Sequence, residues 1–575
     1  MKRLGIYLQP YTLQSILGPL FKLLEAMLEL LVPLVVADII DTGIGLGDGG
    51  YIIRRCLLLI GLGFLGLVSS VTAQYFAAKA AIGFTASVRH ALFQKVQNLS
   101  YAELDKLGTS TLMTRMTSDM NQVQTGLNLA LRLLLRSPFV VFGAMIMAFT
   151  IDVKSAWVFA VIIPLLFVVA FAIMFSCIPL YRRVQGRLDG VLGAAKENLT
   201  GVRVIRAFGK EQQEVESFDE KGAGLLQAQL FVGKISALLN PLTYVMINLA
   251  IVAVLRVGAV QVDTGILTQG QVLALYNYMS QILVELIKMA NLILSMTKAA
   301  ASAKRVASVL ALESSLRAPR ENPEEAANAP AVEFSDVTFT YPTGGAPALS
   351  DISFRLERGR TLGIIGGTGS GKSTLIGLIP RFYDVSQGAV KVDGCDVKEY
   401  PLDTLRRKIG LVPQKALLFK GSIRENLLWG NENATDEQIG QALAAAQAAE
   451  VVSGKPEGLD YEVEAGGRNF SGGQRQRLTI ARALVRQPEI LILDDSASAL
   501  DFATDAALRR ALRELPWHPA VVIISQRTAS IRFADEILVL DDGKPVGLGA
   551  HEQLLESCEV YREIYASQFK KEVAK

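Results

Sequence analysis

Hydrophobic residues are concentrated in long runs in the first half of this 575-residue chain. The runs at 56–75, 156–181 and 235–255 contain no charged residue and are long enough to cross a bilayer, which takes about 20 apolar residues in a helix. Weaker apolar windows at 13–37, 127–151 and 265–288 complete a set of six. A soluble helical core could supply one such run but not six. The pattern therefore predicts a membrane domain of six α-helical spans.

The charges between the spans predict how the chain is oriented. The short connections at 42–50, 152–155 and 262–270 hold Lys154 as their one basic residue, whereas the long connections at 77–125 and 182–234 hold many. Basic loops tend to stay in the cytosol. The long connections, both termini and the second half of the chain are therefore predicted to be cytosolic, although Arg54 and Arg55 at the outer end of the second span run against this rule.

The pattern changes after residue 310. Residues 311–330 contain Pro319, Pro323 and Pro330 among Glu and Ala residues, which is typical of a linker. Alternating apolar residues from Val332 to Phe339 then predict an antiparallel strand. The net charge of +3 is accounted for by the basic loops and indicates no nucleic-acid partner. The four cysteines stand singly and are predicted to be core thiols rather than metal ligands or disulfides: Cys56, Cys177, Cys395 and Cys558.

A glycine-rich segment after the apolar run 361–365 predicts a phosphate-binding loop. Its glycines let backbone N–H groups close on phosphates, Lys372 reaches the outer phosphates, and the Ser373 hydroxyl binds Mg²⁺. A second apolar run, 491–493, ends at Asp494, which we expect to contact Mg²⁺ through a water. The sequence thus predicts that ATP and Mg²⁺ bind here. The predicted loop residues are Gly366, Gly367, Thr368, Gly369, Ser370, Gly371, Lys372, Ser373 and Thr374.

The segment 469–477, Asn-Phe-Ser-Gly-Gly-Gln-Arg-Gln-Arg, resembles the signature motif of ABC ATPases and is followed by a predicted helix at 478–485. The resemblance implies an α/β P-loop ABC ATPase domain with a helical subdomain. It implies that Tyr341 stacks on adenine and that Gln414 belongs to the Q-loop and reaches the Mg²⁺. It also implies that one group of residues faces the ATP held by an opposite subunit: Ser471, Gly472, Gly473, Gln474 and, in the D-loop, Asp501.

Two cytosolic segments, 112–119 and 197–208, resemble the intracellular loops of exporter-type ABC proteins. The resemblance implies an α-helical six-span membrane domain with long cytosolic extensions that end in short coupling helices. The predicted domains are a membrane domain at 1–310, a linker at 311–330 and a nucleotide-binding domain at 331–575. Such a chain is a half-transporter that needs a second half. An importer is disfavoured, because importers usually carry these domains on separate chains.

Two positions of the ATP site depart from the family pattern. Asp495 stands where the family has the longer Glu, and Gln526 stands where it has a proton-handling His. The chain resembles the degenerate-site subunit of heterodimeric bacterial ABC exporters, which implies a partner with the intact Glu and His in the bacterial cytoplasmic membrane. Two alternatives stay open at this point: a homodimeric exporter with a slow Asp495, and a membrane protein that ATP gates or regulates.

The transported molecule is predicted only by charges within the spans. Ionisable groups are costly in lipid and normally face a cavity or a partner. The i,i+3 pairs Lys22/Glu25 and Glu285/Lys288 can instead neutralise each other, and Arg132 and Arg136 are expected to line water or meet acidic groups. A partly charged cavity suits small or amphipathic molecules. Its candidate residues are Glu25, Glu29, Arg132, Arg136 and Glu285.

Overall fold

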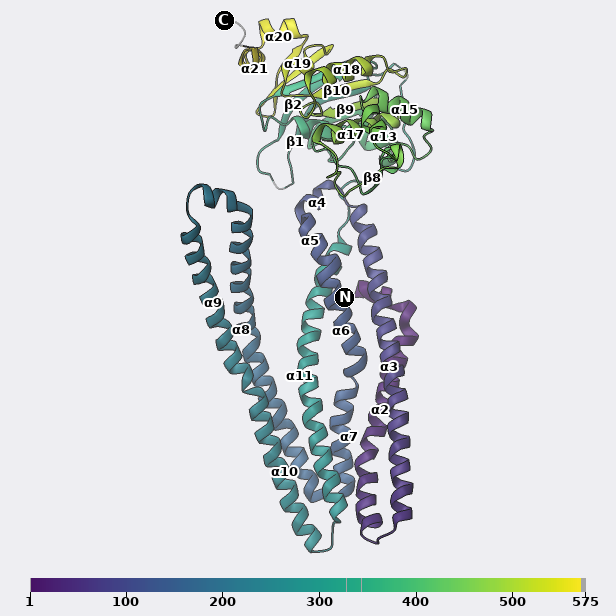
Figure 1. Cartoon of the computed structure of the whole chain (residues 1–575), viewed down its shortest axis with the longest axis vertical. Helices are drawn as coiled ribbons and strands as arrows, with labels where there is room; N and C mark the ends of the chain where they lie inside the picture. Colours follow the sequence, from purple (N-terminus) through teal and green to yellow (C-terminus); the bar gives the residue numbers. More distant parts are fainter. Residues whose placement is uncertain (1, 327, 343, 570–575) are drawn as a thin grey trace. The chain divides into compact units, whose positions relative to one another are not determined.

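The computed structural model describes residues 2–326, 328–342 and 344–569 (Figure 1). It divides into two compact units. The helical unit contains Met1–Gln97 and Ser110–Leu312, and the α/β unit contains Asn98–Thr109 and Glu313–Lys575.

The helical unit is built from long helices that run beside one another (Figure 1). α2 packs along α3, α11 packs along α6 and α7, and α8 packs along α9 and α10. Apolar segments of this length form helices because a bilayer offers no hydrogen-bond partner for backbone N–H and C=O groups, and a helix pairs these groups within the segment. The elements are α1 (Lys2–Gly5), a 3₁₀ turn (Ile6–Tyr11), α2 (Thr12–Asp38), a π turn (Ile39–Ile44), α3 (Gly49–Gln97), α5 (Thr109–Thr114), a π turn (Arg115–Asp119), α6 (Met120–Leu133), α7 (Arg136–Ile151), α8 (Val153–Ala207), α9 (Glu211–Ala237), α10 (Leu239–Asp263) and α11 (Gln269–Ala311).

Five helical segments of the described chain are long and apolar enough to cross a membrane: Gly49–Gln97, Thr109–Ile151, Val153–Ala207, Glu211–Asp263 and Gln269–Ala311. The first four each contain a predicted span, and Gln269–Ala311 overlaps the window at 265–288. α2 contains the remaining window and carries three charged residues in its middle, Lys22, Glu25 and Glu29. The arrangement is consistent with six spans. α8 has 55 residues and is therefore about 80 Å long, far longer than the roughly 30 Å hydrocarbon core.

The predicted span at 127–151 is not one continuous helix. α6 ends at Leu133 and α7 begins at Arg136. Pro138 explains the break, because it has no N–H to donate to the preceding turn. The cysteines also correct one expectation: all four are free, and three are buried, but Cys56 is exposed on α3 and is not a core thiol.

The α/β unit contains a four-stranded sheet in the order β2-β1-β4-β5 and a six-stranded sheet in the order β12-β11-β3-β10-β9-β6. The predicted strand is present as β1, which pairs antiparallel with β2 and β4. In the larger sheet β3, β6, β9, β10 and β11 run parallel, so their carboxyl ends meet at one edge. The main strands are β1 (Val332–Phe339), β2 (Leu349–Leu356), β3 (Thr361–Gly366), β4 (Gln387–Val392), β5 (Cys395–Asp396), β6 (Ile409–Val412), β9 (Ile490–Asp494), β10 (Ala520–Ile524), β11 (Glu536–Asp541) and β12 (Lys544–Gly549).

Apolar side chains from both sheets form one core of this unit, which includes the stacked rings of Phe334 and Phe354. A second core lies among helices that follow β7 (Gly421–Ser422) and β8 (Glu462–Val463). The predicted helix at 478–485 begins earlier, at Gly472, because Ser471 caps its first turn. The helices of the unit are α4 (Tyr101–Leu107), α12 (Lys372–Leu378), α13 (Leu402–Lys408), α14 (Ile423–Leu428), α15 (Asp436–Ala445), α16 (Ala449–Ser453), α17 (Gly472–Val485), α18 (Phe502–Arg513), α19 (Thr528–Ile531), α20 (His551–Ser557) and α21 (Glu559–Phe569).

α4 belongs to the α/β unit although it precedes α6 in the chain. Its N-terminus has a capping box formed by Ser100 and Glu103. The Tyr101 ring lies 4.4 Å from the Phe382 ring, and the Tyr383 hydroxyl donates to Asp105 Oδ2 at 2.5 Å. The helix is thus held by aromatic packing and by a hydrogen bond.

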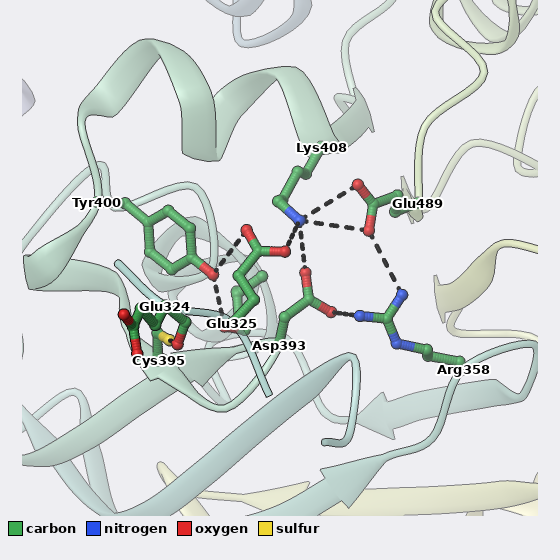
Figure 2. A network of polar contacts seen from close by, with 9 residues as sticks. Glu324, Glu325, Arg358, Asp393, Cys395, Tyr400, Lys408 and Glu489 are labelled. Atoms are coloured by element: carbon green, nitrogen blue, oxygen red, sulfur yellow. Dashed lines mark hydrogen bonds and ion pairs between the residues drawn. The ribbon is translucent and has the colours of Figure 1, made fainter. Parts of the chain in front are cut away.

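The predicted linker is fixed to the same unit by a network of charges around Lys408 (Figure 2). Lys408 Nζ lies 2.9 Å from Glu325 of the linker and 2.8 Å from Asp393. The Cys395 thiol donates to the Glu324 carbonyl at 3.0 Å. Burial alone would lower the pKa of Lys408, but hydrogen bonds to Asp393 and Glu325 outweigh it and raise that pKa above its usual range. The ammonium therefore stays charged among these carboxylates.

Candidate nucleotide site

The predicted phosphate loop connects the end of β3 to the start of α12. Its backbone turns through left-handed conformations at Gly369 (φ +85°) and Gly371 (φ +91°), which favour glycine. At Gly366 a Cβ would come within 2.1 Å of the Leu540 carbonyl oxygen, so no larger residue fits there. These three positions need glycine for the shape of the loop itself.

Lys372 is 9% exposed and turns its ammonium into this loop. Its Nζ donates to the carbonyls of Gly366 at 3.0 Å and Gly367 at 2.6 Å, and to Ser370 Oγ at 3.3 Å. Burial lowers the pKa of Lys372, and the nearby Asp494 and Asp495 oppose that shift. A buried ammonium held only by uncharged oxygens is suited to accept an anion, so the loop fits a phosphate group.

Ser373 and Asp494 meet at the carboxyl ends of the parallel strands. The Ser373 hydroxyl donates to Asp494 Oδ2 at 3.0 Å. Burial raises the pKa of Asp494; Asp495 adds to the rise, while Ser373 and Lys372 oppose it. A hydroxyl and a carboxylate are the oxygen ligands that Mg²⁺ prefers, and a cation here would remove the cost of the buried charge. The pair therefore fits a Mg²⁺ ion.

Aromatic rings form a wall beside the loop. The Tyr341 hydroxyl lies 2.9 Å from Thr374 Oγ1, which ties the ring to the start of α12. Its ring packs edge-on against Phe339 at 4.9 Å and against Tyr383 at 5.3 Å. These contacts hold the Tyr341 ring in place, which suits it to stack on a base.

A cleft of about 370 Å³ brings together most of the predicted site residues: Tyr341, Thr368, Gly369, Gly371, Lys372, Ser373, Thr374, Gln414, Asp494, Asp495 and Gln526. Gly366, Gly367 and Ser370 belong to the loop but are not among the lining residues. Asp495 has a left-handed backbone (φ +45°), and Gln414 Nε2 lies 3.5 Å from its Oδ2. Gln526 is exposed on the same cleft.

Sequence reasoning missed five residues of this cleft: Pro347, Ala348, Ile524, Asp542 and Gly543. Asp542 and Gly543 connect β11 to β12 with positive φ angles of 45° and 76°. An Asp-Gly pair between two apolar runs is a recognisable hairpin signal. That signal could have predicted the turn but not its place on the cleft.

Ser471, Gly472, Gly473, Gln474 and Asp501 are not among the described residues that line the cleft. Ser471 caps α17: its Oγ accepts from Gln474 N at 3.3 Å, and its own N–H donates to Gln474 Oε1 at 2.9 Å. Asp501 caps α18 by accepting from Thr504 N at 2.8 Å and Thr504 Oγ1 at 2.9 Å. Hydrogen bonds from Thr504 lower the pKa of Asp501, so it remains ionised.

Comparison with known families agrees with this geometry. Residues 15–286 match the ABC transporter transmembrane region, and residues 349–498 match the ABC transporter family. An uncharacterised ABC transporter ATP-binding protein of Mycobacterium tuberculosis is 36% identical over 98% of this chain and 97% of its own length. The chain belongs to the ABC transporter family. It is an exporter-type half-transporter, with a membrane domain fused to an ATPase domain.

Other relatives agree over similar lengths. The ATP-dependent lipid A-core flippase of Vibrio vulnificus is 30% identical over 99% of this chain and 97% of its own length. A probable multidrug resistance ABC transporter ATP-binding/permease protein of Bacillus subtilis is 33% identical over the same shares. The fold matches that of a bacterial Atm1-family ABC exporter with ATP bound, with a TM-score of 0.82, 24% identity and coverage of 98% of this chain and 99% of that one. The α/β unit is thus an ATPase domain, and the helical unit belongs to a multi-pass exporter in a lipid bilayer.

The charged residues of the spans form two groups within the helical unit. Arg136 is buried and donates to Glu285 of α11 and, at 2.5 Å, to Glu29 of α2. Glu285 also accepts from Lys288 Nζ at 2.9 Å. Lys22 and Glu25 pair at 2.5 Å. Both i,i+3 pairs are therefore present, and Arg136 meets acidic groups.

Arg132 is less well satisfied than these residues. Its buried Nε finds no hydrogen-bond partner among the described residues.

Proposed function

We propose that this chain is one subunit of a heterodimeric ABC exporter whose own ATP site binds ATP and hydrolyses it poorly. The observation that carries the proposal is that Asp495 and Gln526 line the cleft that holds Lys372. Both residues stand at positions whose side chains would activate the attacking water and carry its proton during hydrolysis. Phosphate binding depends on other groups, which are intact.

The two residues are poorly suited to that chemistry for separate reasons. Asp495 is one methylene shorter than Glu, which draws its carboxylate back by about 1.5 Å. A general base must lie within hydrogen-bond reach of the water, and losing it costs roughly 10²–10⁴-fold in rate. The Gln526 amide can donate a hydrogen bond to a phosphate but cannot take up and release a proton.

The residues around Lys372 would hold the nucleotide. Tyr341 would stack on the adenine, and the loop from Gly366 to Thr374 would enclose the phosphates. Ser373 and Gln414 would bind Mg²⁺ directly, and Asp494 would do so through a water. The bound Mg²⁺ supplies positive charge that offsets the charge of the phosphates.

Hydrolysis would then occur mainly at the partner's site. The partner would be a second half-transporter with the intact Glu and His. Ser471, Gly472, Gly473, Gln474 and Asp501 would complete that site. The division is supported by the observation that none of these residues is among those that line the cleft.

We propose that the exporter lies in the bacterial cytoplasmic membrane, as its resemblance to bacterial exporters implies, and that the charges of its loops set its orientation there. The membrane domain would comprise residues 1–310, and the linker (311–330), the ATPase domain (331–575) and both termini would be cytosolic. The exported molecule would be small or amphipathic and would leave by alternating access. Two relatives, a lipid A-core flippase and a probable multidrug resistance protein, support this class of cargo. Glu25, Glu29, Arg132, Arg136 and Glu285 would face its path.

The test compares three forms of the full chain, purified without a partner in lipid nanodiscs. Wild-type chain should bind fluorescent MANT-ATP with Mg²⁺ and hydrolyse ATP hardly faster than a Lys372→Ala control. The double variant Asp495→Glu, Gln526→His regains a base and a proton carrier. Where two copies of it assemble, so that the signature motif of one completes the ATP site of the other, turnover should rise at least about tenfold.

The alternatives give different results. A slow homodimeric exporter would elute as a dimer of this chain in gel filtration. Its ATP hydrolysis rate would be well above that of the Lys372→Ala control, and Asp495→Asn would abolish that rate. A regulatory protein that ATP gates would gain no turnover from the double variant. Wild-type turnover equal to that of the double variant would show that the site is not degenerate.

A further inference from the structure

Helix α21 contacts the loop that carries Gln526 through the side chain of Gln568. Its Nε2 donates to the carbonyl of Gln526 at 2.7 Å. Its Oε1 accepts from both the backbone N and the Oγ1 of Thr528, each at 2.9 Å. Only this orientation of the amide pairs a donor with the carbonyl and an acceptor with the N–H. One amide group therefore holds the backbone on both sides of Arg527.

Gln568 accepts the hydrogen bond of a backbone N–H, that of Thr528, for which the loop itself provides no acceptor. Thr528 is buried and begins α19, and Arg527 before it provides no side-chain cap. The first N–H groups of a helix have no partner within the helix and need an acceptor from elsewhere. Gln568, 40 residues further along the chain, is that acceptor. Removing it would leave a buried N–H unpaired.

α21 is anchored apart from the cleft, so it can act as a fixed support. Tyr561 is fully buried, and its hydroxyl lies 2.7 Å from His551 Nδ1 of α20. It belongs to an apolar cluster with Ile365 of β3, Ile531 of α19 and Ile537 of β11. Gln568 is thus presented from a helix that is packed against the main sheet.

The other side of the loop is tied to the segment that precedes α18. Arg527 Nη2 donates to the Ser498 carbonyl at 3.3 Å, and its guanidinium lies 5.5 Å from the Phe502 ring centre. Arg527 N donates to Ser525 Oγ at 3.0 Å. The Gln526 side chain is the exposed group between these two supports. Where it points on the cleft is set by the backbone that Gln568 holds.

We propose that Gln568 is a positioning residue of the nucleotide site, which keeps Gln526 on the rim of the cleft. The inference rests on the proposed ATP site, though not on its being degenerate. The C-terminal helix then has a function in nucleotide binding, although none of its residues lines the cleft. Loss of the amide would free the backbone of Gln526 and Thr528 together.

The test uses the full chain in nanodiscs with four variants. Gln568→Leu removes both hydrogen bonds. Gln568→Glu keeps an acceptor for Thr528 but cannot donate to the Gln526 carbonyl when ionised. Thr528→Val removes only the hydroxyl contact. Ser567→Ala is the matched control, because Ser567 is exposed on the same helix and its hydroxyl donates to Ile564 within α21.

The first measurement is hydrogen exchange of the Thr528 amide, and the second is the Kd of MANT-ATP with Mg²⁺. Gln568→Leu should raise the exchange rate at Thr528 at least about fivefold, the factor expected for one lost hydrogen bond, and weaken MANT-ATP binding about two- to fivefold. Gln568→Glu should keep the slow exchange and still weaken binding. Thr528→Val and Ser567→Ala should change both by less than about twofold.

Exchange at Thr528 that is unchanged in Gln568→Leu would overturn the proposal, and so would an unchanged Kd in both Gln568 variants. If Gln568→Leu does not fold, Gln568→Glu decides, because normal binding by that variant contradicts the positioning role. A wild-type chain that binds no MANT-ATP would instead refute the proposed ATP site. The exchange rates separate these two failures.

Discussion

The charge network around Lys408 gives a stability prediction whose size follows from the structure (Figure 2). Lys408 is 12% exposed at its side chain, and its main partner Asp393 is 2% exposed. Removing one member of a buried ion pair costs about 3–5 kcal/mol when the other charge is left alone. When Lys408 is removed, Asp393 still has an ion-pair partner, because Arg358 lies 2.5 Å away. That partner compensates the charge only in part, since the Arg358 side chain is 49% exposed. Glu325 and Glu489 are partly exposed, so water can replace Lys408 for them.

We therefore expect Lys408→Met to destabilise the ATPase domain by about 2–3 kcal/mol, below the range for a fully uncompensated charge. In a domain of this size that corresponds to a fall in Tm of about 5–10 °C. Lys391→Met is the matched control, because Lys391 is more exposed and lies 3.6 Å from its partner Glu333. It should cost less than about 1 kcal/mol.

The assay follows the unfolding of the ATPase domain by tryptophan fluorescence. The chain has three tryptophans, and Trp157→Phe in the membrane domain leaves Trp429 and Trp517 as reporters. Adding Asp393→Asn to Lys408→Met should recover part of the loss, because the remaining buried charge is then removed. The reasoning is refuted if Lys408→Met is as mild as Lys391→Met, or if Asp393→Asn makes it worse.

Two further predictions concern pH and the partner's site. Burial, helped by Arg532 and opposed by Glu552, lowers the pKa of His551, so the unfolded chain binds this proton more readily. The free energy of unfolding of the ATPase domain should therefore fall as the pH drops below about 6.5. The variant His551→Gln should show a smaller fall when tryptophan fluorescence is measured from pH 7.5 to 5.5. Parallel stability curves for wild type and variant would contradict this prediction. In the proposed heterodimer, Ser471→Arg should abolish ATP hydrolysis, whereas Asp495→Asn should reduce it less than about twofold. Equal losses from the two substitutions would rule out the proposed asymmetry.

The sequence predicted the parts of the site that are encoded locally. The loop ending at Lys372 and the strand ending at Asp494 each combine an apolar run with a polar residue at its end. In the folded sheet β10 lies between β3 and β9, and because all three strands are parallel their carboxyl ends lie at one edge. The start of α17 was predicted six residues late, at Leu478 in place of Gly472. The capping box of Ser471 and Gln474 was the signal for the true start.

Contacts between distant segments could not be predicted in this way. Gln568 carries no motif, and its partners lie 40 and 42 residues away. The i,i+3 pair of Glu285 and Lys288 was foreseen from spacing, but the contact of Arg136 with Glu285 joins residues 149 apart. Such contacts depend on how helices pack, and hydrophobic spacing alone leaves that undetermined.

The two caps outside the cleft differ in what they leave available to a partner. Ser471 accepts a hydrogen bond from Gln474 N through one lone pair, and its own hydroxyl proton remains free to donate. A free O–H at a helix start, beside Gly473, is a group that a phosphate can use. Asp501 differs, because both of its oxygens accept from Thr504 and an ionised carboxylate repels phosphate. In the proposed heterodimer, Ser471 is therefore the residue of the two that is suited to contact ATP across the interface, and Asp501 is suited to accept a hydrogen bond there.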